Sequence, residues 1–180
     1  MTIRAFVALP PPAALLGALE DLGHDLDCGR PVPEENLHVT LAFLGEHDRH
    51  VLEDVALELD RIRTPAPLIG FDGIGRFGSK RPTAAHALCT PNPELSALHD
   101  AVRRAAAAGG VALKRRKFIP HVTLARFPAS HPADGDLERW SEEHAGFAAG
   151  PLPAPYFALY RSELTRGGPV YSEAMRFGFT

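Results

Sequence analysis

The chain has 180 residues, of which 45% are hydrophobic and 23% are charged, and its formal net charge is -3. These values are ordinary for a folded domain, and the length is sufficient to bury a sizeable core. The charge excludes wholesale wrapping of a nucleic-acid backbone, which needs a strongly basic face, but it leaves room for a small site that binds one phosphate. We therefore expect a single compact domain over residues 1–180.

The N-terminal segment carries one Arg followed by an apolar stretch, a combination that superficially resembles a signal peptide. Prolines at 10–12 interrupt the stretch, and a strand at 3–9 followed by a Pro-started helix explains the same residues. No apolar run approaches the length of a membrane span. We therefore expect a cytoplasmic protein with no membrane segment, and we expect it to be a monomer.

Three segments show apolar residues at helical spacing, and strand-like runs lie between them. Asp48 is placed to cap the second helix, while Asn92 followed by Pro93 is a cap with Pro at the first helical position. Residues 165–168 have the composition of a hairpin turn. The predicted helices cover 15–22, 51–62 and 95–105, the strands 3–9, 37–44, 68–77, 84–89, 118–127, 154–163 and 169–179, and the Pro-rich loops 31–33, 65–67, 128–132 and 151–155.

Cys28 and Cys89 are the two cysteines of the chain, and they lie far apart in the sequence. They match no CxxC motif and no Cys/His metal spacing. We therefore expect free thiols in a reducing compartment, and we assign neither a catalytic role.

The sequence His-Val-Thr-Leu-Ala occurs twice, beginning at His38 and at His121. A predicted strand and a predicted helix precede each copy, with nearly the same offset of about eighty residues between the two sets. A duplicated strand-helix-strand unit would produce this pattern. Two such strands related by a pseudo-twofold axis would place two imidazoles and two hydroxyls around one cleft.

Each copy puts a His and a Thr on the same face of its strand, because side chains alternate between faces. Histidine can accept or donate a proton near neutral pH, so two histidines can divide these roles across one displacement. Thr hydroxyls can donate hydrogen bonds to phosphate oxygens. A phosphodiester whose nucleophile and leaving group lie in line at phosphorus needs such an arrangement. The alternatives are a structural histidine in each strand and, with weaker support from the ligand spacing, a metal site.

At these residues the chain resembles the 2H phosphoesterase superfamily, and specifically the bacterial and archaeal RNA 2′,3′-cyclic phosphodiesterases, also called 2′,5′ RNA ligases. The two motifs of that family correspond to His38-Val39-Thr40-Leu41 and His121-Val122-Thr123-Leu124. The similarity extends through RAFVALP, FDGIGRFGSKRP and LYRSELTRGGPVYSEAMRF.

The resemblance implies an α+β fold of two pseudo-symmetric lobes, with duplicated strand-helix-strand units and two antiparallel sheets facing a central cleft. It implies hydrolysis of RNA 2′,3′-cyclic phosphate ends, or of a cyclic nucleotide, to a 2′-phosphate without a metal or another cofactor. In this assignment His38 is the proton donor and His121 the proton acceptor. Thr40 and Thr123 hold the phosphate.

Four further features bear on the site. Arg126 matches a family arginine, but strand alternation points it away from His121, so it needs a bulge or a strand end to reach the phosphate. Phe6 matches a family aromatic that could stack on a base. His86 stands where relatives often carry an aromatic residue, which weakens the case for base stacking on that strand. The basic run 114–117 is either a solvated loop or a contact for the RNA backbone.

Two other functions remain open from the sequence. The first is an RNA-end or nucleotide-binding module in which the histidines contact phosphate without turnover. The second is the same chemistry on another small cyclic phosphate, or a site that acts chiefly as a ligase. The absence of a P-loop or a covalent-lysine signature disfavours ligation driven by ATP.

Overall fold

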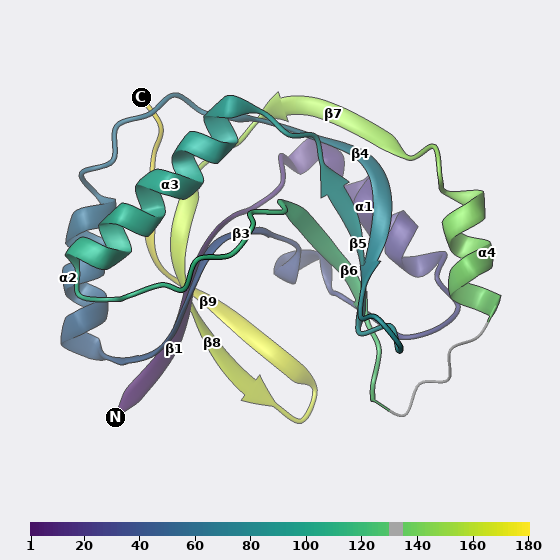
Figure 1. Cartoon of the computed structure of the whole chain (residues 1–180), viewed down its shortest axis with the longest axis horizontal. Coiled ribbons are helices and arrows are strands. Elements are labelled where there is room, and N and C mark those ends of the chain that lie inside the picture. Colours follow the sequence, from purple (N-terminus) through teal and green to yellow (C-terminus); the bar gives the residue numbers. More distant parts are fainter. Residues whose placement is uncertain (130–134) are drawn as a thin grey trace.

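The computed structural model describes residues 1–129 and 135–180, which fold into an α+β structure with a large antiparallel sheet (Figure 1). The helices of this part of the chain are α1 (Ala13–His24), α2 (Arg49–Leu59), α3 (Pro93–Ala108) and α4 (Gly135–Glu143), with a short 3-10 turn at Glu34–Asn36. The strands are β1 (Thr2–Leu9), β2 (Arg30–Pro31), β3 (Val39–Asp48), β4 (Leu68–Phe77), β5 (Ala84–Cys89), β6 (His121–Arg126), β7 (Ala148–Pro153), β8 (Phe157–Thr165) and β9 (Gly168–Phe177).

The sheet has two antiparallel arms that meet between the two motif strands. Its order is β7-β4-β5-β6-β3-β1-β8-β9, and β2 adds to β6 at the side. The arms join through one residue pair, Val39 with Val122, which are the central valines of the two repeats. The predicted fold class is therefore confirmed, with the two expected sheets joined into one open sheet that folds around a central concavity (Figure 1).

The strand order is itself symmetrical about the junction. β3 and β6 are the inner strands, and each pairs with the strand that precedes it by one helix, β1 in one arm and β5 in the other. Both inner strands also carry an extra residue at the same point after the motif histidine. In β3 the unpaired residue is Leu41, and in β6 it is Leu124. This is the arrangement that a duplicated strand-helix-strand unit would produce.

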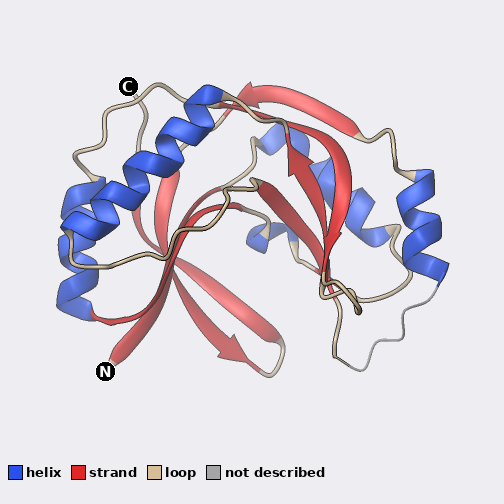
Figure 2. Ribbon diagram, viewed as in Figure 1, coloured by secondary structure: helices blue, strands red, loops and turns tan. Residues whose placement is uncertain are grey.

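The helices cover the outer face of each arm and leave the inner face open (Figure 2). α2 and α3 pack on β1 and β3, while α1 lies against β6 and β7 on the other arm. α4 is fixed to α1 by Trp140, whose buried indole N–H donates to the Leu22 carbonyl oxygen at 3.0 Å. The apolar side chains of both arms therefore bury toward the helices, and the inner face is free to carry polar groups.

Most predicted elements are confirmed, with shifted ends. The Asn92 side chain caps α3 by accepting from the Leu95 N–H at 2.7 Å, and Thr165 pairs with Gly168 across the predicted hairpin turn. Asp48 occupies the N-cap position of α2, but its side chain makes no capping hydrogen bond, so that prediction is wrong in its mechanism.

Two predicted segments need further correction. The strand expected at 118–127 begins only at His121, and the loop expected at 151–155 is partly strand, because β7 continues to Pro153. The loop predicted at 128–132 runs into residues 130–134, which lie outside the described part of the chain. Helix α4 and strands β2 and β7 were not predicted.

Candidate active site

The junction of the two arms brings the four polar motif residues to one face of the sheet. Val39 and Val122 are fully buried on the helix-covered side. In an antiparallel pair the residues on either side of a paired residue point to the opposite face. His38, Thr40 and their counterparts therefore project into the concavity, where all are partly exposed: His38, Thr40, His121 and Thr123. The predicted grouping of two imidazoles and two hydroxyls is thus what the sheet produces.

Both motif histidines are held in the same way by the backbone two residues earlier. The Nδ1 of His38 lies 2.6 Å from the Asn36 carbonyl oxygen, and the Nδ1 of His121 lies 2.6 Å from the Ile119 carbonyl oxygen. A carbonyl can only accept, so each Nδ1 carries a proton and donates it. The remaining ring nitrogen, Nε2, then has a free lone pair when the ring is neutral and an N–H when it is protonated. Each histidine is thereby fixed in a form that can act as base or as acid through Nε2.

Burial favours the neutral form of both rings. Burial, together with the charges of Arg126 and His121, lowers the pKa of His38 to about 4. Burial also lowers the pKa of His121, with the Arg126 charge acting in the same direction. The hydrogen bond to the backbone carbonyl opposes the shift in each case. At neutral pH the free protein therefore holds two neutral imidazoles, whose protonation would be favoured by an anion bound between them.

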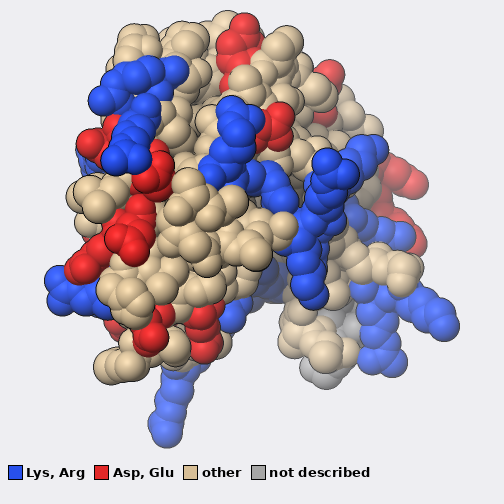
Figure 3. Space-filling view, turned by 60° about the vertical axis from the view of Figure 1, so that its left-hand side comes forward, with Lys and Arg blue, Asp and Glu red and all other residues tan. Residues whose placement is uncertain are grey.

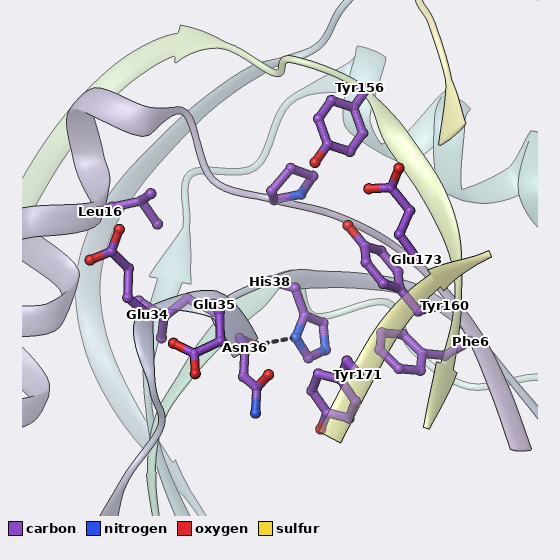
Figure 4. Close-up of a pocket in the computed structure, with 12 residues that line it drawn as sticks. Phe6, Leu16, Glu34, Glu35, Asn36, His38, Tyr156, Tyr160, Tyr171 and Glu173 are labelled. Atoms are coloured by element: carbon purple, nitrogen blue, oxygen red, sulfur yellow. Dashed lines mark hydrogen bonds between the residues drawn. The ribbon is translucent and has the colours of Figure 1, made fainter. Parts of the chain in front are cut away.

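Aromatic rings surround His38. The Phe6 ring lies 5.0 Å from the imidazole centroid, and the Tyr171 ring meets it edge-on at 5.4 Å. Tyr160 stacks on the far side of Phe6 at 5.3 Å. Figure 4 shows these rings on one side of His38 and Asn36 on the other. Together they form one wall of a cavity of about 450 Å³, whose polar lining includes Glu34, Glu35 and Glu173.

His121 has a different neighbourhood, built from Phe77 and His86. The Phe77 ring meets the His121 ring edge-on at 4.7 Å, and the His86 ring lies 5.1 Å away. His86 is only 4% exposed, and burial lowers its pKa to about 4. Its Nδ1 has no hydrogen-bond partner in the described structure. A Cβ at Gly75 would lie 2.6 Å from His86 Nε2, so the glycine makes room for this ring.

Arg126 reaches the cleft because β6 contains the bulge that its role requires. Ala125 pairs with Ala85 and Thr123 with His86, which leaves Leu124 as the extra residue. The bulge reverses the alternation, so Arg126 and Thr123 line the same cavity with His38. Arg126 also lines a second cavity that includes Thr40. Arg126 therefore lines a cavity together with each of the motif threonines.

The structure places all six predicted site residues around the cleft, and it adds residues that the sequence did not indicate. The additions are Tyr160 and Tyr171 near His38 and Phe77 near His121, and His86, which the sequence analysis singled out, also lies beside His121. Tyr160 could have been found only from strand pairing, because it lies directly opposite Phe6 where β8 pairs with β1.

The basic run lies apart from these residues. A cavity of about 440 Å³ is lined by Arg115, Arg116 and Lys117. Arg103 of α3 and Phe118, which follows the basic run, also line it. On the face that includes α2 and α3, Lys and Arg side chains form several groups with acidic side chains among them (Figure 3).

The described residues contain neither a cluster of metal-ligating side chains nor a helix able to span a membrane. Over 1–129 and 135–180, His, Cys, Asp and Glu nowhere gather in threes with metal-binding geometry. No helix in the same ranges has the length and apolar character needed to cross a membrane. Cys28 and Cys89 are both buried, and neither forms a disulfide.

The fold and the cleft define a phosphoesterase-like protein with two matched His-x-Thr strands. A family model described as the 2′-5′ RNA ligase superfamily matches residues 9–150. The chain belongs to this superfamily. A curated RNA 2′,3′-cyclic phosphodiesterase of Escherichia coli (strain K12) is 31% identical over 154 residues, which cover 86% of this chain and 82% of the relative. A second of the same name, from Thermus thermophilus, is 33% identical over 156 residues, covering 82% and 74%.

Solved structures agree with the sequence relatives. A crystal structure of Escherichia coli LigT complexed with 3′-AMP superposes with a TM-score of 0.79 at 28% sequence identity, covering 100% of this chain and 99% of that chain. The structure of LigT in apo form gives a TM-score of 0.77 with 99% and 98% coverage.

Proposed function

We propose that this protein hydrolyses the 2′,3′-cyclic phosphate at the end of an RNA and leaves a 2′-phosphate, without a metal or another cofactor. The observation that carries the proposal is the junction at Val39 and Val122, which sets two imidazoles and two hydroxyls on one face of the sheet. Membership of the superfamily and the printed names of the relatives support the substrate class.

The reaction is an in-line displacement at phosphorus. In the proposed direction His121 Nε2 accepts a proton from water as the water oxygen bonds to phosphorus, and the bond from phosphorus to O3′ breaks. His38 Nε2 donates its proton to the departing O3′, which becomes a hydroxyl. The product is a 2′-phosphomonoester, and the two histidines exchange protons with solvent to restore the starting state.

The remaining site residues stabilise charge on the phosphate. The Thr40 and Thr123 hydroxyls donate hydrogen bonds to the non-bridging oxygens, and the Arg126 guanidinium supplies a fixed positive charge beside them. The aromatic wall of Phe6 and Tyr171 beside His38 is suited to stack on the base of the terminal nucleoside.

His38 becomes protonated when the substrate binds. In the free protein this ring is neutral at pH 7, because burial lowers its pKa to about 4. The phosphate is an anion, and an anion beside an imidazole favours the protonated form. Binding of the substrate therefore charges the acid of the reaction, whereas a site without substrate holds two bases.

The test is turnover of a nucleoside 2′,3′-cyclic monophosphate by the purified protein, with the product identified by phosphorus NMR. We expect the 2′-phosphate, unchanged activity with a chelator, and a loss of at least a hundredfold in kcat for His38→Ala and for His121→Ala. His50→Ala removes an exposed histidine of α2 and should retain full activity. Tight binding of the nucleotide without product would instead identify a binding module, and full activity in either motif variant would refute the two-histidine mechanism.

A further inference from the structure

An exposed phenylalanine lies in β3 at the point that corresponds to Arg126 in β6. Phe43 and Arg126 each follow the central motif valine by four residues, and each comes after the bulged leucine of its strand. The two lobes thus present an aromatic ring and a cation at equivalent positions. Phe43 is 50% exposed, so much of its ring surface is open to a binding partner.

A second guanidinium lies over this ring. The Arg4 guanidinium carbon lies 4.7 Å from the centroid of Phe43. A cation over an aromatic face at this distance is held electrostatically, while its N–H groups stay free to bind an anion. Arg4 and Phe43 line a cavity of about 340 Å³ that also includes His38, Thr40 and Arg126. The pair therefore continues the proposed phosphate site toward the outside of the molecule.

The charges on the two sides of His38 differ in sign. The cavity toward Arg4 has two arginines and no carboxylate among its described lining residues. The cavity on the other side is lined by Glu34, Glu35 and Glu173. A phosphodiester carries a negative charge, so an RNA chain that continues beyond the terminal nucleoside is repelled by the acidic cavity and attracted by the cationic one.

We propose that Arg4 and Phe43 form a second nucleotide subsite, which binds the phosphodiester and the base on the 5′ side of the terminal nucleoside. Arg4 pairs with the phosphodiester, and Phe43 offers its face to the adjoining base. Both interactions are available with any base, so the subsite distinguishes an RNA chain from a cyclic mononucleotide without reading its sequence. The inference rests on the proposed function, because it takes the cyclic phosphate to lie at the motif residues.

The competing location for the RNA chain is the basic run. The cavity that holds Arg115, Arg116 and Lys117 shares no lining residue with the cavities around His38. Its cations could attract RNA, but they do not adjoin the reacting phosphate. The two locations therefore make different predictions for short substrates.

The experiment compares two substrates that end in the same nucleoside. One is a nucleoside 2′,3′-cyclic monophosphate without a 5′-phosphate, and the other is a single-stranded RNA of a few nucleotides with a 2′,3′-cyclic phosphate end. The quantity of interest is the ratio of kcat/KM for the RNA to kcat/KM for the nucleoside 2′,3′-cyclic monophosphate. We expect Arg4→Gln to lower this ratio about tenfold, and to reduce the salt dependence of RNA affinity by about 0.7 in the logarithmic slope. Phe43→Ala should lower the ratio severalfold through lost stacking.

Two variants serve as controls. Arg49→Gln removes another exposed arginine, from α2, where it pairs with Glu53 at 2.7 Å, and should leave the ratio unchanged. Arg116→Gln tests the competing location. A ratio that stays within twofold in Arg4→Gln, or one that falls in Arg116→Gln instead, would overturn the subsite.

Failure of the subsite and failure of the proposed function have different signatures. If the wild-type protein turns over neither substrate, the proposed function fails. The subsite is then still decided by the affinity for a labelled single-stranded RNA, measured by fluorescence anisotropy, in Arg4→Gln against Arg49→Gln. Equal affinities would overturn it, and a weaker affinity in Arg4→Gln alone would support it.

Discussion

Two histidines with lowered pKa values should make the folded protein sensitive to acid. Burial lowers the pKa of both His38 and His86 to about 4, whereas the same side chains titrate near 6.5 in an unfolded chain. As the pH falls below 6.5, the unfolded chain binds protons at these histidines and the folded protein does not, so the free energy of unfolding decreases. The decrease continues until the pH passes the folded value near 4, and above pH 6.5 these groups have almost no effect.

The linkage relation gives the size of the effect. For a pKa of about 4 in the folded protein and 6.5 in the unfolded chain, lowering the pH from 7 to 4.5 removes about 2 kcal/mol per histidine. Together His38 and His86 would remove about 4 kcal/mol, which is a large part of the 5–15 kcal/mol typical of a whole domain. Carboxylates also titrate in this range, so the comparison must be made between variants and not only between pH values.

The assay is urea unfolding at pH 7 and pH 4.5, followed by the fluorescence of Trp140, the single tryptophan of the chain, which is 2% exposed. His86→Leu keeps an apolar side chain at the site and cannot bind a proton. We expect this variant to lose about 2 kcal/mol less than the wild type between the two pH values. His50→Leu, on the exposed surface of α2, is the matched control and should behave as the wild type. An identical loss in His86→Leu and the wild type would refute the assignment of a neutral, buried His86.

Three further predictions concern single sites. Arg126→Gln should weaken substrate binding and move the acidic limb of the kcat/KM profile to higher pH, because the guanidinium lowers the pKa of both motif histidines; an unmoved profile would place Arg126 too far away to act. Asn92→Ala should lower the free energy of unfolding by about 1 kcal/mol in urea titrations at pH 7, through loss of the α3 cap, whereas an unchanged midpoint would mean that the cap contributes nothing. Cys89 should resist iodoacetamide at pH 8 in the folded protein and react in urea, because burial raises the pKa of its thiol to about 12; rapid labelling without urea, read by mass spectrometry, would contradict this.

The sequence predicts well those elements whose signal is local. α3 begins where Asn92 and Pro93 predict, because the cap and the first turn lie within four residues of each other. α4 was missed because Leu137 and Trp140 are its buried residues and the rest of its described surface is polar, too little for a helical period. Strand β7 was missed because its prolines favour a loop, and its place beside β4 is set by a partner far away in the sequence.

Some features of the site can be predicted from local sequence, and others depend on pairing between strands that are distant in the sequence. The repeat of His-Val-Thr-Leu-Ala is visible in the sequence, and strand alternation correctly pairs each imidazole with a hydroxyl. The orientation of Arg126 is not visible, because it depends on the register between β6 and β5, where Leu124 is left unpaired. The aromatic wall is likewise absent from any local pattern, since Tyr171 comes from a hairpin that reaches the site only by pairing with β1.

In the proposed mechanism, we infer the direction of proton transfer from the surroundings of the two histidines and not from the histidines themselves. The backbone holds both rings with the same 2.6 Å hydrogen bond, so each can act as acid or base through Nε2. His38 packs against Phe6 and Tyr171 on one side, and its pKa of about 4 makes its protonated form a strong acid that exists mainly while an anion is bound. A group of this kind is suited to give a proton to a departing oxygen and to remain neutral afterwards. The pseudo-symmetry thus supplies two equivalent groups, and the different packing around them favours His38 as the donor.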